Sequence, residues 1–187
     1  ILDGHGQFIY EIALANQAQP IDGFTSDFAQ GNWDVIIDNS GFFGAGFADV
    51  TFSSNTLTLE TLAGGVAQAS IAMPGEGTLS FDYDYNGADP FFDFFMIDLN
   101  GNVVADVTNP ASGSFSEDVE AGWVLVFAVD DDGFNPFGPA VPSTAEISNF
   151  GFAPAGPVVS GFEPCWGFVT GEDKTAPVVE CPDNTAV

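Results

Sequence analysis

Basic side chains are almost absent from this sequence. Its 187 residues include 27 Asp and Glu, but only one lysine (Lys174), one histidine (His5) and no arginine. A surface this negative repels the phosphates of nucleic acids and of anionic lipids, so neither nucleic-acid binding nor direct membrane insertion is expected. The carboxylates need counter-ions from solution, and Na⁺ and bound Ca²⁺ are both suitable. Adaptation to salty water, or solubility alone, would explain the same charge.

The residues that most hydrolases require are also scarce. His5 stands between Gly4 and Gly6, the sequence has no G-x-S-x-G motif, and no second histidine is present to share a zinc ion. A serine or cysteine nucleophile needs a neighbouring base, so no nucleophilic enzyme is expected. A glycosidase needs only two carboxylates, and the abundance of Asp does not exclude one. We still expect no enzyme, because a small sandwich without evident long loops offers little material for a cleft.

Long helical patterns and apolar runs that could span a bilayer are missing as well. Instead, 20 Phe, 22 Gly and 12 Pro indicate many short strands separated by tight turns. Alternating apolar and polar residues predict half-buried strands, and more continuously apolar stretches predict central strands. The alternating segments are 33–38, 56–60 and 79–85, the apolar ones are 92–99 and 123–129, and a closing strand is expected near 144–152.

Turn signals separate these segments at 53–55, 74–77 and 100–101, the last of which is the Asn-Gly pair typical of a tight hairpin. Roughly eight to ten strands are therefore expected between Ile21 and Phe152. The pattern predicts an all-β fold, a jelly-roll-like antiparallel β-sandwich. We divide the chain into an N-terminal flanking segment (1–20), the sandwich (21–152) and a proline-rich linker with the segment after it (153–187).

The N-terminal flank carries an apolar stretch, 8–14, which fits either an extra edge strand or a short helix. Phe8, Ile9, Tyr10 and Ile12 would form an exposed apolar edge if this flank stood alone, which favours aggregation. We therefore expect this flank, or the segment after Pro157, to pack against a neighbouring module or another copy of the same large protein.

The C-terminal segment resembles a known extracellular module. Residues 173–182 read Asp-Lys-Thr-Ala-Pro-Val-Val-Glu-Cys-Pro and resemble the start of a HYR domain, which is immunoglobulin-like. Residues 165–168, Cys-Trp-Gly-Phe, resemble the end of such a unit, and the sixteen-residue step from Cys165 to Cys181 resembles the join between consecutive units. The resemblance implies that this tail begins, or links to, a further module.

Four segments of the sandwich carry a second resemblance: 79–85, 89–93, 127–132 and 145–150. Together they resemble a β-sandwich of large secreted Bacteroidota proteins, in which such sandwiches lie among HYR repeats of gliding-motility adhesins (SprB-like). This resemblance implies secretion by the type IX route and a location at the cell surface or in an extracellular filament.

The two cysteines fit that extracellular compartment, because disulfides persist there. A disulfide between Cys165 and Cys181 is therefore expected. In complete HYR units, however, the cysteine at the position of Cys181 resembles one that pairs with a later strand, so this second pairing stays open. Neither a CxxC spacing nor a nearby histidine favours a metal role.

The stretch from Asp82 to Asp93 is the richest in potential metal ligands. Its start, Asp-Tyr-Asp-Tyr-Asn-Gly, matches the D-x-D-x-N-G start of a calcium loop, and Asp93 falls at the twelfth position. Strands rather than helices are expected on both sides, which favours a plain cluster of oxygen ligands over an EF-hand. A second acidic cluster follows an apolar strand at 130–132. We expect Ca²⁺ at this end of the sandwich, or else solvated carboxylates; the ligands would be Asp84, Asp89, Asp93, Asp130 and Asp132, with Asp82 and Asn86 as further members.

This layout is also distantly similar to that of CUB domains. There a jelly roll binds Ca²⁺ between an acidic strand end, an aromatic–Asp pair (here Phe92–Asp93) and a late acidic loop (here 130–132). The cysteines of CUB domains are missing from this chain, so the similarity rests on the acidic residues and the order of the strands.

Three functions are compatible with the sequence. The favoured one is a non-catalytic structural or adhesive module of a large secreted surface protein or filament. The alternative is a carbohydrate-binding module that recognises surface glycans, for which Trp33, Trp123 and Trp166 are candidates, although core packing is the expected use of Trp33 and Trp123. The third is a secreted enzyme domain. A screen against a glycan array would separate the first two.

Overall fold

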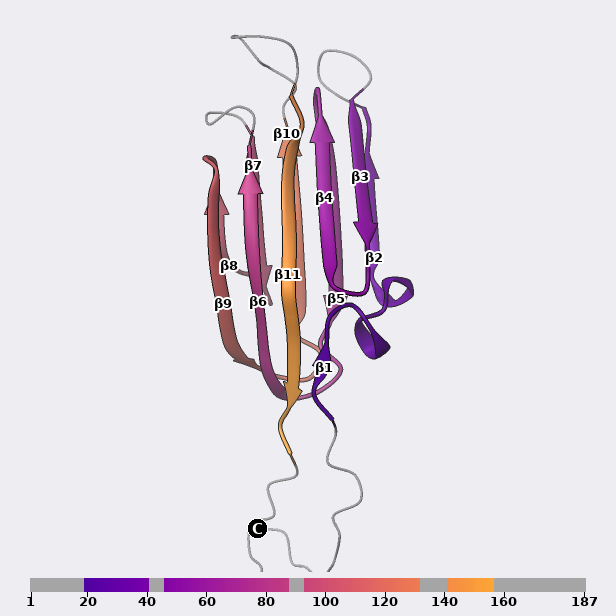
Figure 1. Ribbon diagram of the computed structural model, residues 1–187, viewed down its shortest axis with the longest axis vertical. Coiled ribbons are helices and arrows are strands. Elements are labelled where there is room, and N and C mark those ends of the chain that lie inside the picture. Colours follow the sequence, from indigo (N-terminus) through magenta and orange to yellow (C-terminus); the bar gives the residue numbers. More distant parts are fainter. Residues whose placement is uncertain (1–18, 41–45, 88–92, 132–140, 157–187) are drawn as a thin grey trace, which may run out of the picture. The chain divides into compact units, whose positions relative to one another are not determined.

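The computed structural model describes residues 19–40, 46–87, 93–131 and 141–156. All the described elements belong to one compact unit, Ala18–Gly156. They form two antiparallel sheets that face each other (Figure 1). No helix in these ranges is long and apolar enough to cross a membrane. The predicted all-β sandwich is therefore confirmed.

The two sheets divide the strands almost equally. In the six-stranded sheet the order is β3 (Phe47–Phe52), β4 (Thr56–Leu62), β11 (Ser143–Pro154), β6 (Gly77–Asn86) and β9 (Ala111–Val119), and β1 (Ile21–Asp22) also pairs with β11. In the five-stranded sheet the order is β2 (Asp34–Asp38), β5 (Gly65–Ala72), β10 (Val124–Asp131), β7 (Phe94–Leu99) and β8 (Asn102–Val107). The chain stays within one sheet only from β3 to β4 and from β7 to β8, and each of its other connections between described strands crosses to the opposite sheet. Such winding between two sheets is typical of a jelly roll.

Most predicted strands and turns are present. Asn100 and Gly101 form the predicted two-residue hairpin between β7 and β8, and both have the positive φ (54° and 81°) that such a turn requires. The closing strand runs further than predicted, because Ala153 and Pro154, which the sequence assigned to the linker, still pair with β6. Pro154 is tolerated because it lies at the end of β11, beyond the pairing with β1.

The expected half-burial of β2 is wrong. All five of its residues are exposed, and Val35, Ile36 and Ile37 are between 40% and 53% exposed. The cause is position, because β2 is an edge strand whose described partner in the sheet is β5. The alternation of apolar and polar residues correctly predicted a strand here. It could not predict whether other parts of the chain would cover the apolar side chains of that strand.

The space between the sheets is filled mainly by aromatic rings. Phe81 of β6 meets Phe127 of β10 edge to face, with centroids 5.1 Å apart and planes at 85°. Trp33 also stacks on Phe127, with ring centroids 6.1 Å apart and planes at 23°. Such pairs contribute about 0.5–1.5 kcal/mol each beyond the burial of their area. The two sheets are thus held together by direct ring contacts.

Two short 3-10 turns close one side of this core between β1 and β2. They are η1 (Ser26–Phe28) and η2 (Gln30–Asn32), and they bring Phe28 and Trp33 inward. Phe28 is fully buried against Phe150, at a centroid distance of 4.9 Å. The Trp33 indole Nε1–H donates a hydrogen bond to the Phe28 carbonyl oxygen at 2.9 Å, so the polar end of the buried ring is satisfied.

A bulge interrupts the pairing of β11 with β6 between Ser148 and Gly151. Asn149 lies in this bulge with a φ of +48°, in the left-handed region. Its Nδ2–H donates a hydrogen bond to Asp82 Oδ2 at 2.7 Å. Asparagine suits the position because it adopts this backbone conformation more readily than most residues with a side chain.

We predict that Asn149→Ala lowers the free energy of unfolding by about 1–2 kcal/mol, because alanine is strained at positive φ. Asn149→Gly should cost less, since glycine adopts this φ freely. Urea unfolding of the two variants beside the parent chain measures the difference. Equal losses in both variants would mean that the lost hydrogen bond, and not the backbone conformation, sets the cost.

Candidate functional site

The residues predicted to bind calcium do not all face the same way. Asp82, Asp84 and Asn86 alternate along β6 with the inward-facing Phe81, Tyr83 and Tyr85, so their side chains lie on the outer face of the six-stranded sheet. Asp93 instead is 2% exposed and faces the interior. The structure therefore does not bring Asp82, Asp84 and Asn86 together with Asp93. Asp89 and Asp132 lie outside the described residues.

The calcium-loop motif at 82–87 begins as an extended strand. Asp84 is exposed and lies opposite Glu146 of β11 and Ser112 of β9. Asp82 is engaged nearby in the sheet: hydrogen bonds from Ser114 and then from Asn149 hold its pKa below the usual value for an aspartate. This carboxylate stabilises the bulge in β11, and the strand does not curl around an ion as an EF-hand loop does.

Five polar side chains are buried together at the other side of this sheet, between the two layers. We call them the buried polar cluster, and each is at most 6% exposed. Four of them come from the ends of β4, β6, β10 and β11, and the fifth directly precedes β7, at the end of the sandwich where β4, β6 and β10 finish and β11 begins (Figure 1). The members are Thr61, Tyr85, Asp93, Asp131 and Ser143.

The sheet register places the two carboxylates of the cluster on neighbouring strands. Asp130 of β10 pairs with Phe94 of β7, so the next residues outward are Asp131 and Asp93. The Ser143 hydroxyl donates to Asp93 Oδ2 at 2.7 Å, and the Gly64 backbone N–H donates to Asp131 Oδ1 at 3.3 Å. Hydrogen bonds therefore hold both acids in the interior, although neither donor carries a charge.

Two hydroxyl groups of the cluster have no hydrogen-bond partner, those of Tyr85 and Thr61. Thr61 lies directly opposite Ser143 in the sheet. Burial raises the pKa of the Tyr85 phenol and the negative charge of Asp93 raises it further; the neighbouring Ser143 hydroxyl lowers it, and the charge of Asp131 raises it. The phenol is thus close enough to both carboxylates to feel their charge, but no hydrogen bond joins it to them.

Of these five residues, Asp93 alone belongs to the ligand set predicted from the sequence. Asp131 was passed over in favour of Asp130 and Asp132, yet Leu125, Phe127 and Val129 are fully buried, and continuing their alternation leads to Asp131. Asp130, on the other face of β10, is only partly buried. Thr61, Tyr85 and Ser143 carried no comparable signal, because a single hydroxyl at a strand end is common.

Other predicted sites give a mixed result. Within the described ranges, no three His, Cys, Asp or Glu side chains are grouped so that they could hold a metal ion. Trp33 is 6% exposed and Trp123 is partly buried against the core, as expected for packing residues. The predicted Cys165–Cys181 disulfide, Trp166, His5 and the apolar stretch at 8–14 lie outside the described residues.

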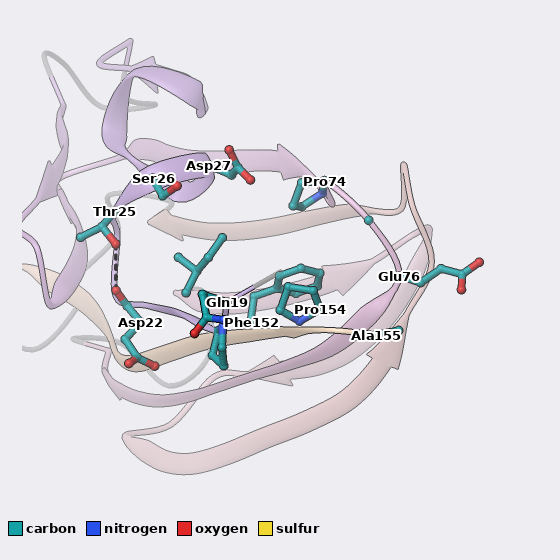
Figure 2. Close-up of a pocket in the computed structure, with 13 residues that line it drawn as sticks. Gln19, Asp22, Thr25, Ser26, Asp27, Pro74, Glu76, Phe152, Pro154 and Ala155 are labelled. Carbon is teal, nitrogen blue, oxygen red and sulfur yellow. Dashed lines mark hydrogen bonds between the residues drawn. The ribbon is translucent and has the colours of Figure 1, made fainter. Parts of the chain in front are cut away.

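An open hollow of about 750 Å³ lies at the opposite end of the sandwich from the buried polar cluster. In Figure 2, Gln19, Phe152 and Pro154 lie beside one another, and Ser26, Asp27 and Pro74 lie across from them. The Thr25 hydroxyl bonds to the Asp22 carbonyl oxygen at its edge, at 3.0 Å. The hollow therefore marks the place where the chain enters and leaves the sandwich.

No protein-family model matches this chain, and no curated protein matches it significantly. Among solved structures, the chain is similar to the secreted serine protease VesC from Vibrio cholerae (15% identity, TM-score 0.40), covering 59% of this chain but 24% of VesC. It is also similar to a family 35 carbohydrate-binding module from Clostridium thermocellum (17% identity, TM-score 0.32), covering 69% and 98% of the two chains. The K1 cleaved adhesin domain of Lys-gingipain from Porphyromonas gingivalis W83 matches at 11% identity and a TM-score of 0.35, covering 67% and 92%. Likenesses at this level support no inference about what the chain binds.

The position of Tyr85 predicts a pH dependence. The unfolded chain loses the tyrosine proton near pH 10, as tyrosine ordinarily does, whereas the folded chain keeps it because its pKa is raised. Stability should therefore be fully present below pH 10 and fall above it, by up to roughly 1.4 kcal/mol for each pH unit. Urea unfolding between pH 8 and about 11 measures this slope.

Tyr85→Phe should flatten the slope, and Tyr83→Phe, which alters the partly buried neighbour on the same strand, should leave it in place. An identical alkaline slope in the parent chain and in Tyr85→Phe would show that other groups cause the loss.

Proposed function

We propose that the sandwich is a non-catalytic adhesive module of a large secreted cell-surface protein, attached at one end and presenting the other. The observation that carries this proposal is the pairing of the first and last strands. Ile21 of β1 lies opposite Phe152 of β11, and residues on both sides of this pair line the same hollow. The chain therefore enters and leaves the sandwich at the same end.

This arrangement determines how the module carries load. If the chain is pulled from both sides, the force acts across the end of β11, and its pairs with β6 open one after another, beginning at Pro154 and Gly77. A module that extends a stalk resists force better when all the hydrogen bonds of its terminal strands are loaded at the same time. We infer that this sandwich projects from its parent protein and does not act as a load-bearing link.

The non-catalytic assignment rests on the side chains available. None of the described residues is His, Cys, Lys or Arg, so this part of the chain offers no imidazole, thiol or amine for nucleophilic chemistry. The adjacent carboxylates that could suggest a glycosidase, Asp93 and Asp131, are 2% and 6% exposed. A sugar ring could not reach them without opening the sandwich.

The surface-protein context is supported by sequence. The resemblance of residues 173–182 to the start of a HYR unit, and of the sandwich to those of SprB-like adhesins, is what points to type IX secretion and a place among further modules. The strongly acidic surface is consistent with function outside the cell in contact with dissolved cations.

A mechanical test follows from the shared attachment end. Pulling between Gln19→Cys and Gly156→Cys should unfold the sandwich at low force, because strand pairs break in sequence. Pulling between Asn86→Cys and Gly156→Cys should need a clearly higher force, because these positions lie at opposite ends of the β6–β11 ladder and load all its hydrogen bonds together. Optical tweezers measure both, in chains that also carry Cys165→Ser and Cys181→Ser. A higher force for the first pair would contradict the proposed role.

The carbohydrate-binding alternative predicts a different surface. Aromatic rings that stack on sugars must be exposed, and among the described residues the exposed large apolar side chains include one aromatic, Phe47, at 43%. We expect that no glycan on an array binds the intact chain through Phe47. Phe47→Ala should therefore leave the binding pattern on the array unchanged. Micromolar binding to one defined glycan that this substitution removes would instead assign the alternative function.

A further inference from the structure

The edge strand β2 is apolar, regular and exposed. Its three central residues, Val35, Ile36 and Ile37, are 40%, 53% and 44% exposed. The strand pairs with β5 over all five of its residues without a register shift, and no described strand pairs with its other edge. Three consecutive β-branched residues favour an extended backbone. The free edge of β2 therefore offers a regular row of backbone N–H and C=O groups to a further strand.

The three other strands at the ends of the two sheets lack this combination. A bulge between Ile97 and Asp98 interrupts the pairing of β8 with β7, and such a bulge hinders the addition of another strand. The exposed residues of β9 are serines and acids. In β3, the exposed residues besides Phe47 are Asp49 and Thr51. Among the described end strands, β2 is thus the one best suited to extend its sheet.

The side chains of β2 divide between its two faces. Val35 and Ile37 lie opposite two fully buried alanines of β5, so they point towards the space between the sheets. Ile36 points the other way, as do Asp34 and Asp38 at the two ends of the strand. A strand added at the free edge of β2 would therefore lie beside two apolar side chains on one face and two carboxylates on the other.

The charges of Asp34 and Asp38 determine which strand can pair there. Both residues are exposed. Hydrogen bonds from the side chain and the backbone of Ser40 hold the pKa of Asp38 below its usual value, so this carboxylate stays charged. Opposite charges across two strands are favourable, and like charges are unfavourable. A strand with two basic side chains four residues apart would meet both aspartates.

The present sequence cannot supply such a strand, either from its own ends or from a second copy. It contains one lysine and no arginine, so none of its segments carries two such basic side chains. If β2 paired antiparallel with β2 of a second copy about Ile36, each Asp34 would lie opposite an Asp38. Each copy would also bring a formal net charge of −26. The partner strand therefore comes from outside these 187 residues and from a chain of different composition.

We propose that the free edge of β2 binds an extended segment of a partner protein, in which two basic side chains four residues apart flank β-branched residues. The segment adds a sixth strand to the five-stranded sheet. Its apolar side chains lie beside Val35 and Ile37, and its basic side chains pair with the two aspartates. Backbone hydrogen bonds supply the affinity in this mode of recognition, and the side chains supply the specificity. This interaction goes beyond the proposed function and does not depend on where the chain enters and leaves the sandwich.

A synthetic peptide with the core Lys-Val-Thr-Val-Lys tests the proposal, because its symmetric sequence matches β2 in either direction. We call it the lysine peptide. In a ¹⁵N-labelled sample of the intact chain, it should shift the backbone amide signals of residues 34–38. It should also slow hydrogen exchange at every second residue of β2, because alternate N–H groups face the free edge. The glutamate peptide, with the core Glu-Val-Thr-Val-Glu, should leave these signals unchanged.

Charge variants separate pairing at β2 from general attraction to an acidic protein. Asp34→Asn with Asp38→Asn should weaken binding of the lysine peptide about fivefold, because two cross-strand charge pairs are lost. The matched control is Asp106→Asn with Glu117→Gln, which changes exposed residues of β8 and β9, alters the net charge equally and should keep the affinity. Asp34→Lys with Asp38→Lys should bind the glutamate peptide in place of the lysine peptide.

The proposal is wrong if the lysine peptide shifts no amide signal of β2, or shifts those of β8 and β9 equally. Equal weakening in the β2 variant and in its matched control would mean that the peptide responds only to net charge. A concentration-dependent dimer of the parent chain that Ile36→Lys abolishes would assign this edge to a second copy and would also contradict the proposal.

Discussion

The scarcity of positive charge is the constraint on which the rest of this structure depends. With 27 acidic side chains and one lysine, the chain cannot pair its carboxylates internally. Strand alternation resolves most of this problem, since it turns Asp82, Asp84 and Glu146 towards solvent while the rings between them face inward. Among the described residues Asp93 and Asp131 are instead buried, and uncharged groups of Ser143 and Gly64 donate hydrogen bonds to them.

The core accepts this buried charge at one end because aromatic packing holds the remainder. Phe81, Phe127 and Trp33 form a continuous set of ring contacts between the sheets, and Phe28 and Phe150 extend it towards β1. These contacts lie away from the strand ends that carry the cluster, so the sandwich does not depend on the cluster alone. Ring contacts fill the middle of the sandwich, and the buried polar cluster lies at the end where β4, β6 and β10 finish.

Much of the fold could be predicted because it follows local rules. The Asn100–Gly101 turn, the alternation of β6 and the apolar run of β10 each depend on neighbours in sequence. The buried polar cluster was harder to predict from the sequence, because its members come together only through the pairing register of distant strands. Alternation could have selected Asp131 within 130–132, whereas the pairing of Thr61 with Ser143 and the use of Asp82 by the Asn149 bulge depend on contacts between distant segments.

The central claim is that the chain enters and leaves the sandwich at one end, where Ile21 pairs with Phe152. The distance between spin labels at Gln19→Cys and Gly156→Cys, in a chain that also carries Cys165→Ser and Cys181→Ser, tests it most directly. The account predicts a short distance, comparable to the spacing of neighbouring strands. A distance near the length of β11, about 40 Å for its 12 residues, would contradict it.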